Sequence, residues 1–386
     1  MTSQALPAGR RRRWPRHAAY GLAGLAVLLP TGTAGAGWYF ATRVIDAAAP
    51  REYPVEVRAF LPGRVTLSRD ADTLRDVPLA LLWPGGHAIL GRVVSVSRVA
   101  VVREVTSITS GELRPGLRAY VSGSVYAGDP LTARDLTFDE VAVPGELGPL
   151  PAWLVPGTSS TWVVAVHGRR ASRAEALRVL PTLAGHGLPM LVVTYRNDVE
   201  APPSPDRYYH LGDTESRDVT AAVSYALAHG ATDVVLYGWS MGGAAVLSAL
   251  RHLDPGVVRA AVLDCPVVDW VSTLYLNARQ RGLPAPLAWS ALRWIERRLR
   301  VRLSALDHRR DIVSLTVPVL LYVDDSDDVV DARAAHEYAG LRPDLVQLVE
   351  TSGAGHTRSW NADPEAYAKA LSTFLHRVLL DAPETR

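Results

Sequence analysis

The sequence predicts a protein of the α/β class, in which helices cover both faces of a largely parallel sheet. Three observations support this fold class. From about Leu136 onward, short apolar runs typical of buried strands alternate with longer runs typical of helices. A glycine-rich turn, GWSMGG at 238–243, joins one such strand to one such helix. The chain of 386 residues is also long enough to bury a large core.

Residues 1–50 are predicted to form a cytoplasmic basic tail and a single transmembrane helix that acts as a signal anchor. The basic run RRRWPR precedes the uncharged residues 18–42, which would span about 37 Å as a helix, enough for a bilayer core of about 30 Å. The excess of arginine before this run predicts a cytoplasmic N-terminus and an exported remainder.

The alternative for this segment is a cleaved signal peptide. Pro30 and the small residues 34–36 resemble a cleavage site, whereas the aromatic cluster GWYF favours an uncleaved anchor at the far interface. The sequence therefore predicts a single-pass protein of the cell membrane with an extracytoplasmic catalytic domain, or else a secreted protein. Both interpretations place the remainder of the chain outside the cytoplasm.

Residues 51–136 are predicted to form a β-rich extension, because they show no helical period. The expected strands are EVRAF, VPLALLW, HAILG, VVSVSRVAVV and LRAYVSGSVY, which Gly, Pro and Asp residues separate. No constellation of reactive side chains occurs here, so we expect a packing subdomain rather than a binding site.

Residues 137–386 carry the alternating pattern. Strands are expected in TWVVAVHG, PMLVVTYR, TDVVLYG, VVRAAVLDCPVV, VPVLLYV and LVQLVE, and helices in SRAEALRVLPTLAGHG, DTESRDVTAAVSYALAHG, MGGAAVLSALRHL and PEAYAKALSTFLHRVLL. Residues 270–314 interrupt the pattern and are predicted to form a helical cap. Its segment PLAWSALRWIERRLRVRL has an apolar and a basic face, and we expect packing on the core rather than contact with lipid headgroups.

Charge and cysteine content exclude some classes of protein. Forty-one basic residues against 39 acidic ones give a net charge of +2, which argues against a dedicated nucleic-acid binder. The single cysteine, Cys265, excludes an intrachain disulfide, and its apolar surroundings predict a small buried side chain.

Ser240, at the centre of GWSMGG, is the candidate nucleophile. A serine on a sharp turn between strand and helix is exposed to substrate, and Gly238 and Gly242 avoid collisions with the neighbouring backbone. The helix that follows offers free N–H groups and a positive dipole end to an oxyanion. We expect the backbone N–H of Met241 to be one oxyanion donor and that of Arg169, after the strand VVAVHG, to be the other.

A serine hydroxyl needs a base to remove its proton and an acid to orient that base. His356, in the glycine-flanked loop SGAGHTRSW, follows the last predicted strand and is the candidate base. The acid is expected from the segment VDDSDDVVD. This segment lacks the glycine and the distal glutamate that a calcium-binding loop requires. Four of its aspartates are close enough to compete: Asp324, Asp325, Asp327 and Asp328.

These motifs resemble the α/β-hydrolase superfamily, specifically its serine hydrolases of the prolyl-oligopeptidase-like or "alpha/beta hydrolase domain-containing" type. The matching segments are VHGRR, TYRND, GDTESRDVTAAVSYA, YGWSMGGA, PVLLYVDDSDDVV and GAGHT, which span about 137 to 380. Residues 1–136 have only a loose similarity to extensions of membrane-anchored bacterial hydrolases.

The resemblance implies which aspartate is the acid. In the family the acid lies nine residues after the proline that opens its strand. Counting from Pro318 gives Asp327, with Asp328 and Asp325 as alternatives. Two departures affect this assignment: Asp324 stands at the family's glycine and Asp331 at its usual proline. Ser240 excludes the dehalogenases and epoxide hydrolases of the superfamily, for which the resemblance implies an aspartate nucleophile.

The predicted function is a carboxylesterase-like serine hydrolase that cleaves an ester, in preference to an amide, peptide or thioester bond, through an acyl-enzyme. The expected substrate is a small-molecule or lipid-like ester. No metal or organic cofactor and no nucleic-acid partner are expected, because the sequence has no H-E-x-x-H, paired cysteines or phosphate loop. The alternative is a non-catalytic envelope protein that uses the same fold for binding or scaffolding. The sequence does not predict an oligomeric state.

Overall fold

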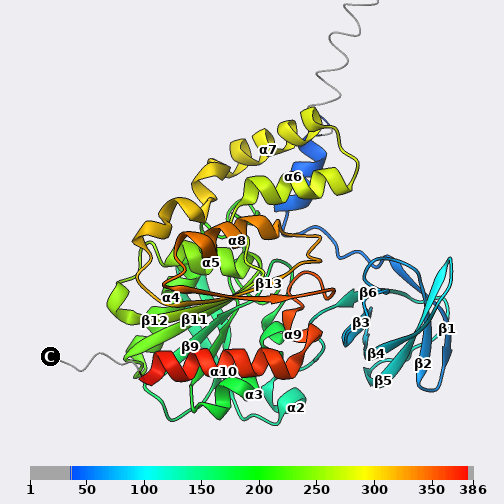
Figure 1. Ribbon diagram of the computed structural model, residues 1–386, viewed down its shortest axis with the longest axis horizontal. Coiled ribbons are helices and arrows are strands. Elements are labelled where there is room, and N and C mark those ends of the chain that lie inside the picture. The colour runs from blue at the N-terminus through cyan, green and yellow to red at the C-terminus, as the bar shows by residue number, and fades with distance from the viewer. Residues whose placement is uncertain (1–34, 36, 381–386) are drawn as a thin grey trace, which may run out of the picture.

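The computed structural model describes residue 35 and residues 37–380. Two units are visible in Figure 1: a small barrel (residues 55–122) on the right and a large domain (residues 139–380) built on a central sheet. The short helix α2 (Pro130–Arg134) lies in the connection between them.

Six antiparallel strands close the barrel in the order β1-β2-β5-β4-β3-β6. They are β1 (Val55–Leu61), β2 (Arg64–Ser68), β3 (Leu79–Trp83), β4 (Gly86–Val96), β5 (Ala100–Ser110) and β6 (Arg118–Ser122). Alternate apolar side chains fill the interior, including Val57, Leu67 and Leu90.

The expectation of one strand in VVSVSRVAVV is wrong. A turn separates β4 from β5, because the Ser97 hydroxyl accepts the backbone N–H of Ala100 (3.0 Å) and bends the chain back. The strand β2 was not predicted at all, since the polar residues of RVTLS weaken its apolar alternation.

The large domain has an eight-stranded sheet in the order β14-β13-β12-β11-β9-β10-β8-β7. Its strands are β7 (Asp139–Gly145), β8 (Gly148–Val155), β9 (Thr161–Val166), β10 (Met190–Val193), β11 (Asp233–Trp239), β12 (Val258–Asp264), β13 (Val319–Asp324) and β14 (Val346–Thr351). The sheet is mixed: β9 to β14 run parallel, whereas at one edge β8 pairs antiparallel with β10, and β7 pairs antiparallel with β8 to form a hairpin. The predicted parallel core is therefore correct and the sequence missed the hairpin.

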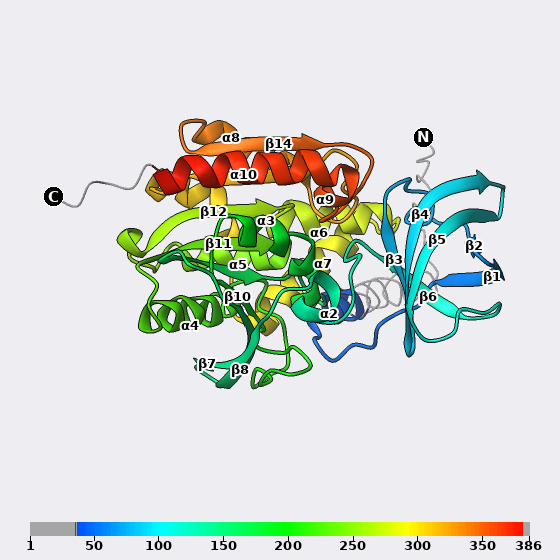
Figure 2. The same cartoon turned by 90° about the horizontal axis from the view of Figure 1, so that it is seen from below.

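Helices cover both faces of this sheet (Figures 1 and 2). One apolar core lies between the sheet and α4 (Glu215–Ala228), α5 (Met241–Ala249) and α8 (Ala332–Leu341), and a second lies against α3 (Leu180–Gly185) and α10 (Pro364–Leu380). The short helix α9 (Ser359–Ala362) precedes α10. Strand residues alternate between the two cores: Val164 faces the first and Val163 the second.

The predicted continuous helix over 172–187 is wrong. The chain forms the 3-10 helix η1 (Arg173–Arg178) and then the short helix α3. Pro181 explains the break, because its ring fixes φ and it has no N–H to continue the helical hydrogen bonds of the preceding turn.

The cap (residues 270–314) contains two helices and two 3-10 turns: α6 (Trp270–Gln280), α7 (Ala285–Leu299), η3 (Leu303–Leu306) and η4 (His308–Ser314). The remaining 3-10 turn, η2 (Pro255–Val257), precedes β12. Leu292 and Ile295 of α7 point into the first core, while Trp289 on the same helix is 60 % exposed. In Figure 1 the cap lies above the carboxyl ends of the central strands.

Residues 37–45 form a helix that contacts the cap, where Arg298 Nη1 donates to the Thr42 hydroxyl (3.4 Å). The predicted basic tail and most of the predicted membrane span, residues 18–34, lie outside the described residues. Among the residues that are described, no helix is both long and apolar enough to cross a membrane.

Candidate active site

Ser240 lies between the end of β11 and the start of α5. Its backbone has φ 51° and ψ −119°, a conformation that costs a non-glycine residue about 1–3 kcal/mol. Two hydrogen bonds to the end of β12 and the loop after it hold this conformation: Ser240 N donates to Asp264 O (3.0 Å), and Val267 N donates to Ser240 O (3.2 Å). The turn therefore presents the serine side chain at the carboxyl edge of the sheet.

The glycines around Ser240 allow this turn to pack against its neighbours. A Cβ at Gly238 would lie 2.7 Å from Gly243 Cα, and one at Gly242 would overlap the backbone carbonyl oxygens of Val166 and His167. These neighbours are backbone atoms of β9 and α5, which cannot swing aside as a flexible side chain can.

We expect Gly242→Ala to lower the free energy of unfolding by about 3 kcal/mol, because the new methyl group forces the start of α5 away from β9. Urea denaturation followed by circular dichroism measures the change. Gly340→Ala is the matched control: no heavy atom lies within 4 Å of its new Cβ, and helix propensity should make it neutral or stabilising by up to about 1 kcal/mol. Equal stability of the two variants would contradict the close packing described here.

His356 and Asp327 come from the loops that follow β14 and β13. His356 Nε2 lies 2.7 Å from Ser240 Oγ, and His356 Nδ1 lies 2.7 Å from Asp327 Oδ2. The His356 side chain is 15 % exposed and that of Asp327 only 2 %. Because parallel strands end at one edge of the sheet, three segments far apart in sequence meet there.

The surroundings of Asp327 favour its ionised form. Burial opposes ionisation, but the adjacent His356 ring and the backbone N–H groups of Val329 (2.8 Å) and Val330 (2.9 Å) outweigh it, so the pKa of Asp327 is lowered. For His356, burial acts to lower the pKa, while the Asp327 carboxylate raises it more strongly. The pKa of His356 is therefore above its usual value, and its imidazolium form is stabilised by Asp327.

This shift predicts an acid limb in the pH profile. Only neutral His356 can accept the serine proton, so kcat/KM should fall as the pH drops through a pKa above the usual value of about 6.5. The contribution of protonated His356 to the free energy of unfolding depends on pH in the opposite direction to activity. It is fully present below about pH 6.5 and is lost as the pH rises through the pKa of His356 in the folded protein. Ester hydrolysis between pH 5 and 9 measures the limb.

His336→Gln is the control for this profile. His336 also has a raised pKa, because it is hydrogen-bonded to Glu350 (2.6 Å), but it lies on α8 away from Ser240. The variant should leave the acid limb in place. A limb with a midpoint below pH 6 in the native protein would be inconsistent with the shift assigned to His356.

The other three candidate aspartates contact different groups. Asp328 Oδ2 accepts from Arg75 Nη2 (3.1 Å), and Asp325 accepts from the hydroxyls of Ser326 and Ser352 (2.8 and 2.9 Å). Asp324, at the position of the family's glycine, accepts the backbone N–H of Gly355 (2.8 Å). Asp324 thus anchors the loop that carries His356.

The two predicted oxyanion donors belong to segments that adjoin Ser240. Met241 is the first residue of α5, where the N–H groups have no partner within the helix. Arg169 follows Gly168, where an added Cβ would lie 3.1 Å from Ser240 Cβ. The N–H of Gly168 itself is occupied, since it donates to Glu175 Oε2 (2.7 Å).

Several residues that connect the barrel to the loops of Asp327 and His356 were not predicted from the sequence. Arg75, at 3.1 Å from Asp328, also donates to the backbone carbonyls of Ser326 and Gly353. Next to His356, Arg358 Nη1 contacts Asp72 Oδ1 of the barrel (2.5 Å). Single charged residues in an arginine-rich chain give no signal of such pairing.

Asn361 completes this contact between the barrel and the catalytic loops. Its Nδ2 donates to the backbone carbonyls of Pro78 (2.7 Å) and Gly123 (2.9 Å) beside the barrel, while its Oδ1 accepts from the buried Arg178 (2.9 Å). Arg178 also donates to the carbonyl of Thr357 (2.7 Å), next to His356.

Asp264 is a second missed residue, although a carboxylate within the apolar run AVLDCPVV is a visible signal. It is fully buried behind Ser240 and accepts from the Ser359 and Tyr367 hydroxyls (3.2 and 3.1 Å). Burial raises the pKa of Asp264 to about 6. It supports the turn and does not contact His356 by any hydrogen bond of the described residues.

One group of side chains has the composition of a metal site. The donor atoms of Cys265, Asp327 and His356 lie within 4.8 Å of one another. Burial raises the pKa of the Cys265 thiol well above its usual range, and the Cys265 sulfur lies 3.9 Å from the Ser359 hydroxyl. Asp327 and His356 are also engaged with each other.

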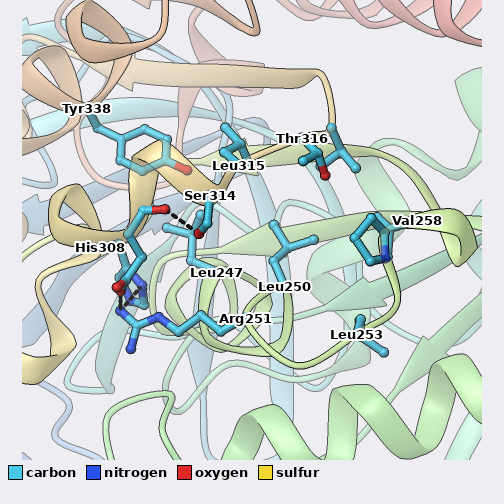
Figure 3. A pocket seen from close by; sticks show the side chains of 13 residues that line it. Leu247, Leu250, Arg251, Leu253, Val258, His308, Ser314, Leu315, Thr316 and Tyr338 are labelled. Carbon is cyan, nitrogen blue, oxygen red and sulfur yellow. Dashed lines mark hydrogen bonds and ion pairs between the residues drawn. The ribbon is translucent and has the colours of Figure 1, made fainter.

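Two cavities differ in what they can hold. The smaller, of about 50 Å³, has room for one or two waters and lies between α5 and η4 (Figure 3). Here Arg251 Nη2 contacts His308 Nδ1 (3.1 Å), and burial, with Arg251 beside it, lowers the pKa of His308 to about 3. This pocket is a structural feature of the core.

The larger cavity, of about 1070 Å³, contains Ser240 and His356 in its wall. Other parts of its wall come from the barrel, from the helix at residues 37–45, from the cap and from loops of the large domain, including residues 168–172 after β9. The volume suits an organic molecule of moderate size, and we refer to it below as the large cavity.

The comparisons with known proteins agree with this architecture. The model of the "Alpha/beta hydrolase family" matches residues 141–370, more than half of the chain, and the protein belongs to this family. The model of a "Domain of unknown function (DUF8805)" matches residues 56–122, which form most of the barrel. No curated protein matches the chain.

Solved esterases share the fold of the large domain. An esterase from Pyrococcus furiosus is 19% identical with a TM-score of 0.53, covering 65% of this chain and 94% of its own. Est1E from Butyrivibrio proteoclasticus, solved with ferulic acid, is 17% identical with a TM-score of 0.50, covering 62% and 100%. At these identities the likeness shows the fold alone.

Proposed function

We propose that the protein is a serine hydrolase that cleaves an ester through an acyl-enzyme on Ser240, and that it is of the prolyl-oligopeptidase-like type within its family. The observation that supports this most strongly is the pair of 2.7 Å contacts that links Ser240 to His356 and His356 to Asp327. A hydroxyl next to a base that is itself oriented by a carboxylate is an activated nucleophile.

In this mechanism Ser240 Oγ attacks the carbonyl carbon of the ester while His356 Nε2 accepts its proton. The backbone N–H groups of Met241 and Arg169 stabilise the oxyanion. His356 then donates the proton to the leaving alcohol, which breaks the ester bond and leaves an acyl group on Ser240. Water then gives a proton to His356 and attacks the acyl carbon. The acid leaves as His356 returns this proton to Ser240 Oγ, and Asp327 stays ionised throughout.

The test is an assay of the full chain in detergent with p-nitrophenyl butyrate and a fluorophosphonate probe. Ester turnover together with labelling of one site supports the proposal. If only matched amide or thioester substrates were turned over, the proposed scissile bond would be an amide or a thioester instead of an ester. If neither turnover nor labelling occurs, the fold serves as a binding or scaffolding surface.

We further propose that the chain is a single-pass membrane protein whose large domain lies outside the cytoplasm. The support is in the sequence: five arginines (10–13 and 16) precede the uncharged residues 18–42, and only Arg43 and Arg51 follow closely. The helix at residues 37–45 that follows contacts the cap through Thr42 and Arg298.

A reporter fused after Arg386 tests this orientation. Alkaline phosphatase, which folds only outside the cytoplasm, is expected to be active, and green fluorescent protein exported unfolded should stay dark. If the green fluorescent protein fusion were fluorescent and the alkaline phosphatase fusion inactive, the large domain would lie in the cytoplasm, which would contradict the proposed orientation. Recovery of a mature chain that begins at Gly37 would identify a cleaved signal peptide in place of the anchor.

A further inference from the structure

The lining of the large cavity combines apolar side chains with arginines. The cap contributes an apolar wall, which includes Leu274, Ala288, Leu292 and Ile295. The lining also contains arginines from three segments: Arg51, Arg169 and Arg170 in the loop after β9, and Arg281 at the end of α6 in the cap. A ligand that fills the cavity therefore meets both hydrocarbon and guanidinium groups.

The acidic residues of the cavity do not neutralise these four arginines. Four acidic residues line the cavity, and each already has a partner: Glu52 pairs with Arg43, Asp72 with Arg358, Asp328 with Arg75, and Glu175 with Arg178 and the N–H of Gly168. None of them contacts the guanidinium of Arg51, Arg169, Arg170 or Arg281 among the residues that the structure describes.

Backbone carbonyls hold the four guanidinium groups instead. Arg169 donates to Val44 O (3.3 Å), Arg170 to Ala49 O (2.7 Å), and Arg281 to Asn277 O (3.1 Å). Arg51 donates to the carbonyl of Arg170 and stacks on the Tyr120 ring, 4.6 Å from its centroid. A carbonyl orients a guanidinium but leaves its charge uncompensated and its other N–H groups available.

Electrostatics agree with this absence of counter-charge. The pKa of Arg169 is lowered by burial and by the positive charges of Arg170 and Arg281. Like charges that are gathered in a partly buried wall destabilise one another unless an anion binds between them.

We infer that the large cavity binds an ester that carries a hydrocarbon part and an anionic group, a phosphate or a carboxylate, and that Arg169, Arg170 and Arg281 recognise the anion. This inference rests on the proposed ester hydrolysis for its reaction, but the binding site is a separate property. The anion is expected close to the scissile bond, because Arg169 follows the glycine that contacts Ser240.

A binding experiment tests the anion site without turnover. Isothermal calorimetry on the full chain in a neutral detergent compares octyl phosphate with octanol and octyltrimethylammonium. Octyl phosphate should bind about 10- to 100-fold more tightly than octanol, the range for charge-assisted hydrogen bonds to one or two guanidinium groups. The cationic ligand should bind more weakly than octanol.

Variants identify the groups that recognise the anion. The double variant Arg170→Gln and Arg281→Gln should remove most of the difference between octyl phosphate and octanol. Arg297→Gln is the matched control, since Arg297 lies exposed on α7 and does not line the cavity, and it should keep the difference. A double variant that binds octyl phosphate as tightly as the native chain would overturn the assignment to these arginines.

Hydrolysis then distinguishes the source of the anionic ester. A water-soluble pair, butyryl glycerol phosphate and monobutyrin, differs only in the phosphate, and so does a vesicle pair of phosphatidic acid and diacylglycerol. A soluble substrate is supported if kcat/KM is at least about 10-fold higher for butyryl glycerol phosphate than for monobutyrin. A lipid substrate is supported if the preference for the phosphate-bearing ester occurs only in vesicles, for phosphatidic acid over diacylglycerol.

Failure of this inference is distinct from failure of the proposed function. Turnover of both neutral and anionic esters at equal rates, with equal binding of octanol and octyl phosphate, would overturn the anion site while ester hydrolysis stands. Tight and specific binding of octyl phosphate without any ester turnover would support the anion site and refute the proposed reaction.

Discussion

Ser240→Ala is expected to lower ester turnover by roughly 10⁴- to 10⁶-fold and to abolish labelling by a fluorophosphonate. The variant removes the hydroxyl that lies 2.7 Å from His356 Nε2, and the remaining triad members cannot compensate because the three groups act as a unit. Folding should change little, since the backbone hydrogen bonds of Ser240 to Asp264 and Val267 do not use the side chain.

Ser248→Ala is the matched control for this change. Ser248 lies on the same helix, α5, and its buried hydroxyl has no hydrogen-bond partner among the described residues. Its removal should leave both labelling and turnover close to native values. Undiminished turnover in Ser240→Ala would refute the nucleophile assignment and favour the scaffolding alternative.

Asp327→Asn is expected to reduce turnover by about 10⁴-fold. An asparagine amide in this place cannot stabilise the imidazolium of His356, and it favours the wrong tautomer of the ring. The two backbone N–H groups that donate to Asp327 Oδ1 would still hold the amide oxygen, so the loop should keep its shape. Steady-state hydrolysis of p-nitrophenyl butyrate measures the loss.

Asp328→Asn and Asp325→Asn distinguish this effect from a general effect of charge in the loop. Both remove the same charge within two residues of Asp327, but Asp328 faces Arg75 and Asp325 faces loop hydroxyls. Each of these two variants should reduce ester turnover far less than Asp327→Asn does. If Asp328 were the sensitive position, the loop after β13 would be bent differently from the conformation described here.

The parallel core of the sheet could be predicted from sequence because its strands are buried on both faces and read as continuous apolar runs. Strand β9, with all six residues buried, is an example. The hairpin β7–β8 gave no such signal, since it alternates between buried and exposed residues and contains prolines. The order of strands and the antiparallel edge follow from contacts between distant segments.

Part of the candidate site could likewise be predicted from the sequence, and part could not. The residue types identified Ser240 and His356, because each stands in a glycine-rich loop with a fixed place between a strand and a helix. They did not separate the four aspartates of VDDSDDVVD, since the direction of each carboxylate depends on the turn after β13. That turn is closed by Asp327 N, which donates to Asp324 O (3.1 Å), and by contacts to a loop some thirty residues later. Local sequence does not encode such contacts.

The contacts of Arg75, Arg358 and Asn361 across the two units bear on how this protein can be divided and evolve. A hydrolase domain whose catalytic loops were self-supporting could be cut out and attached to another carrier domain. Here the loops that bear the acid and the base are each tied to the barrel, through Asp328 and through Arg358. The barrel and the large domain are therefore expected to be inherited, exchanged and engineered as one piece, and surface changes on the barrel at Asp72 or Arg75 should appear as changes in catalysis.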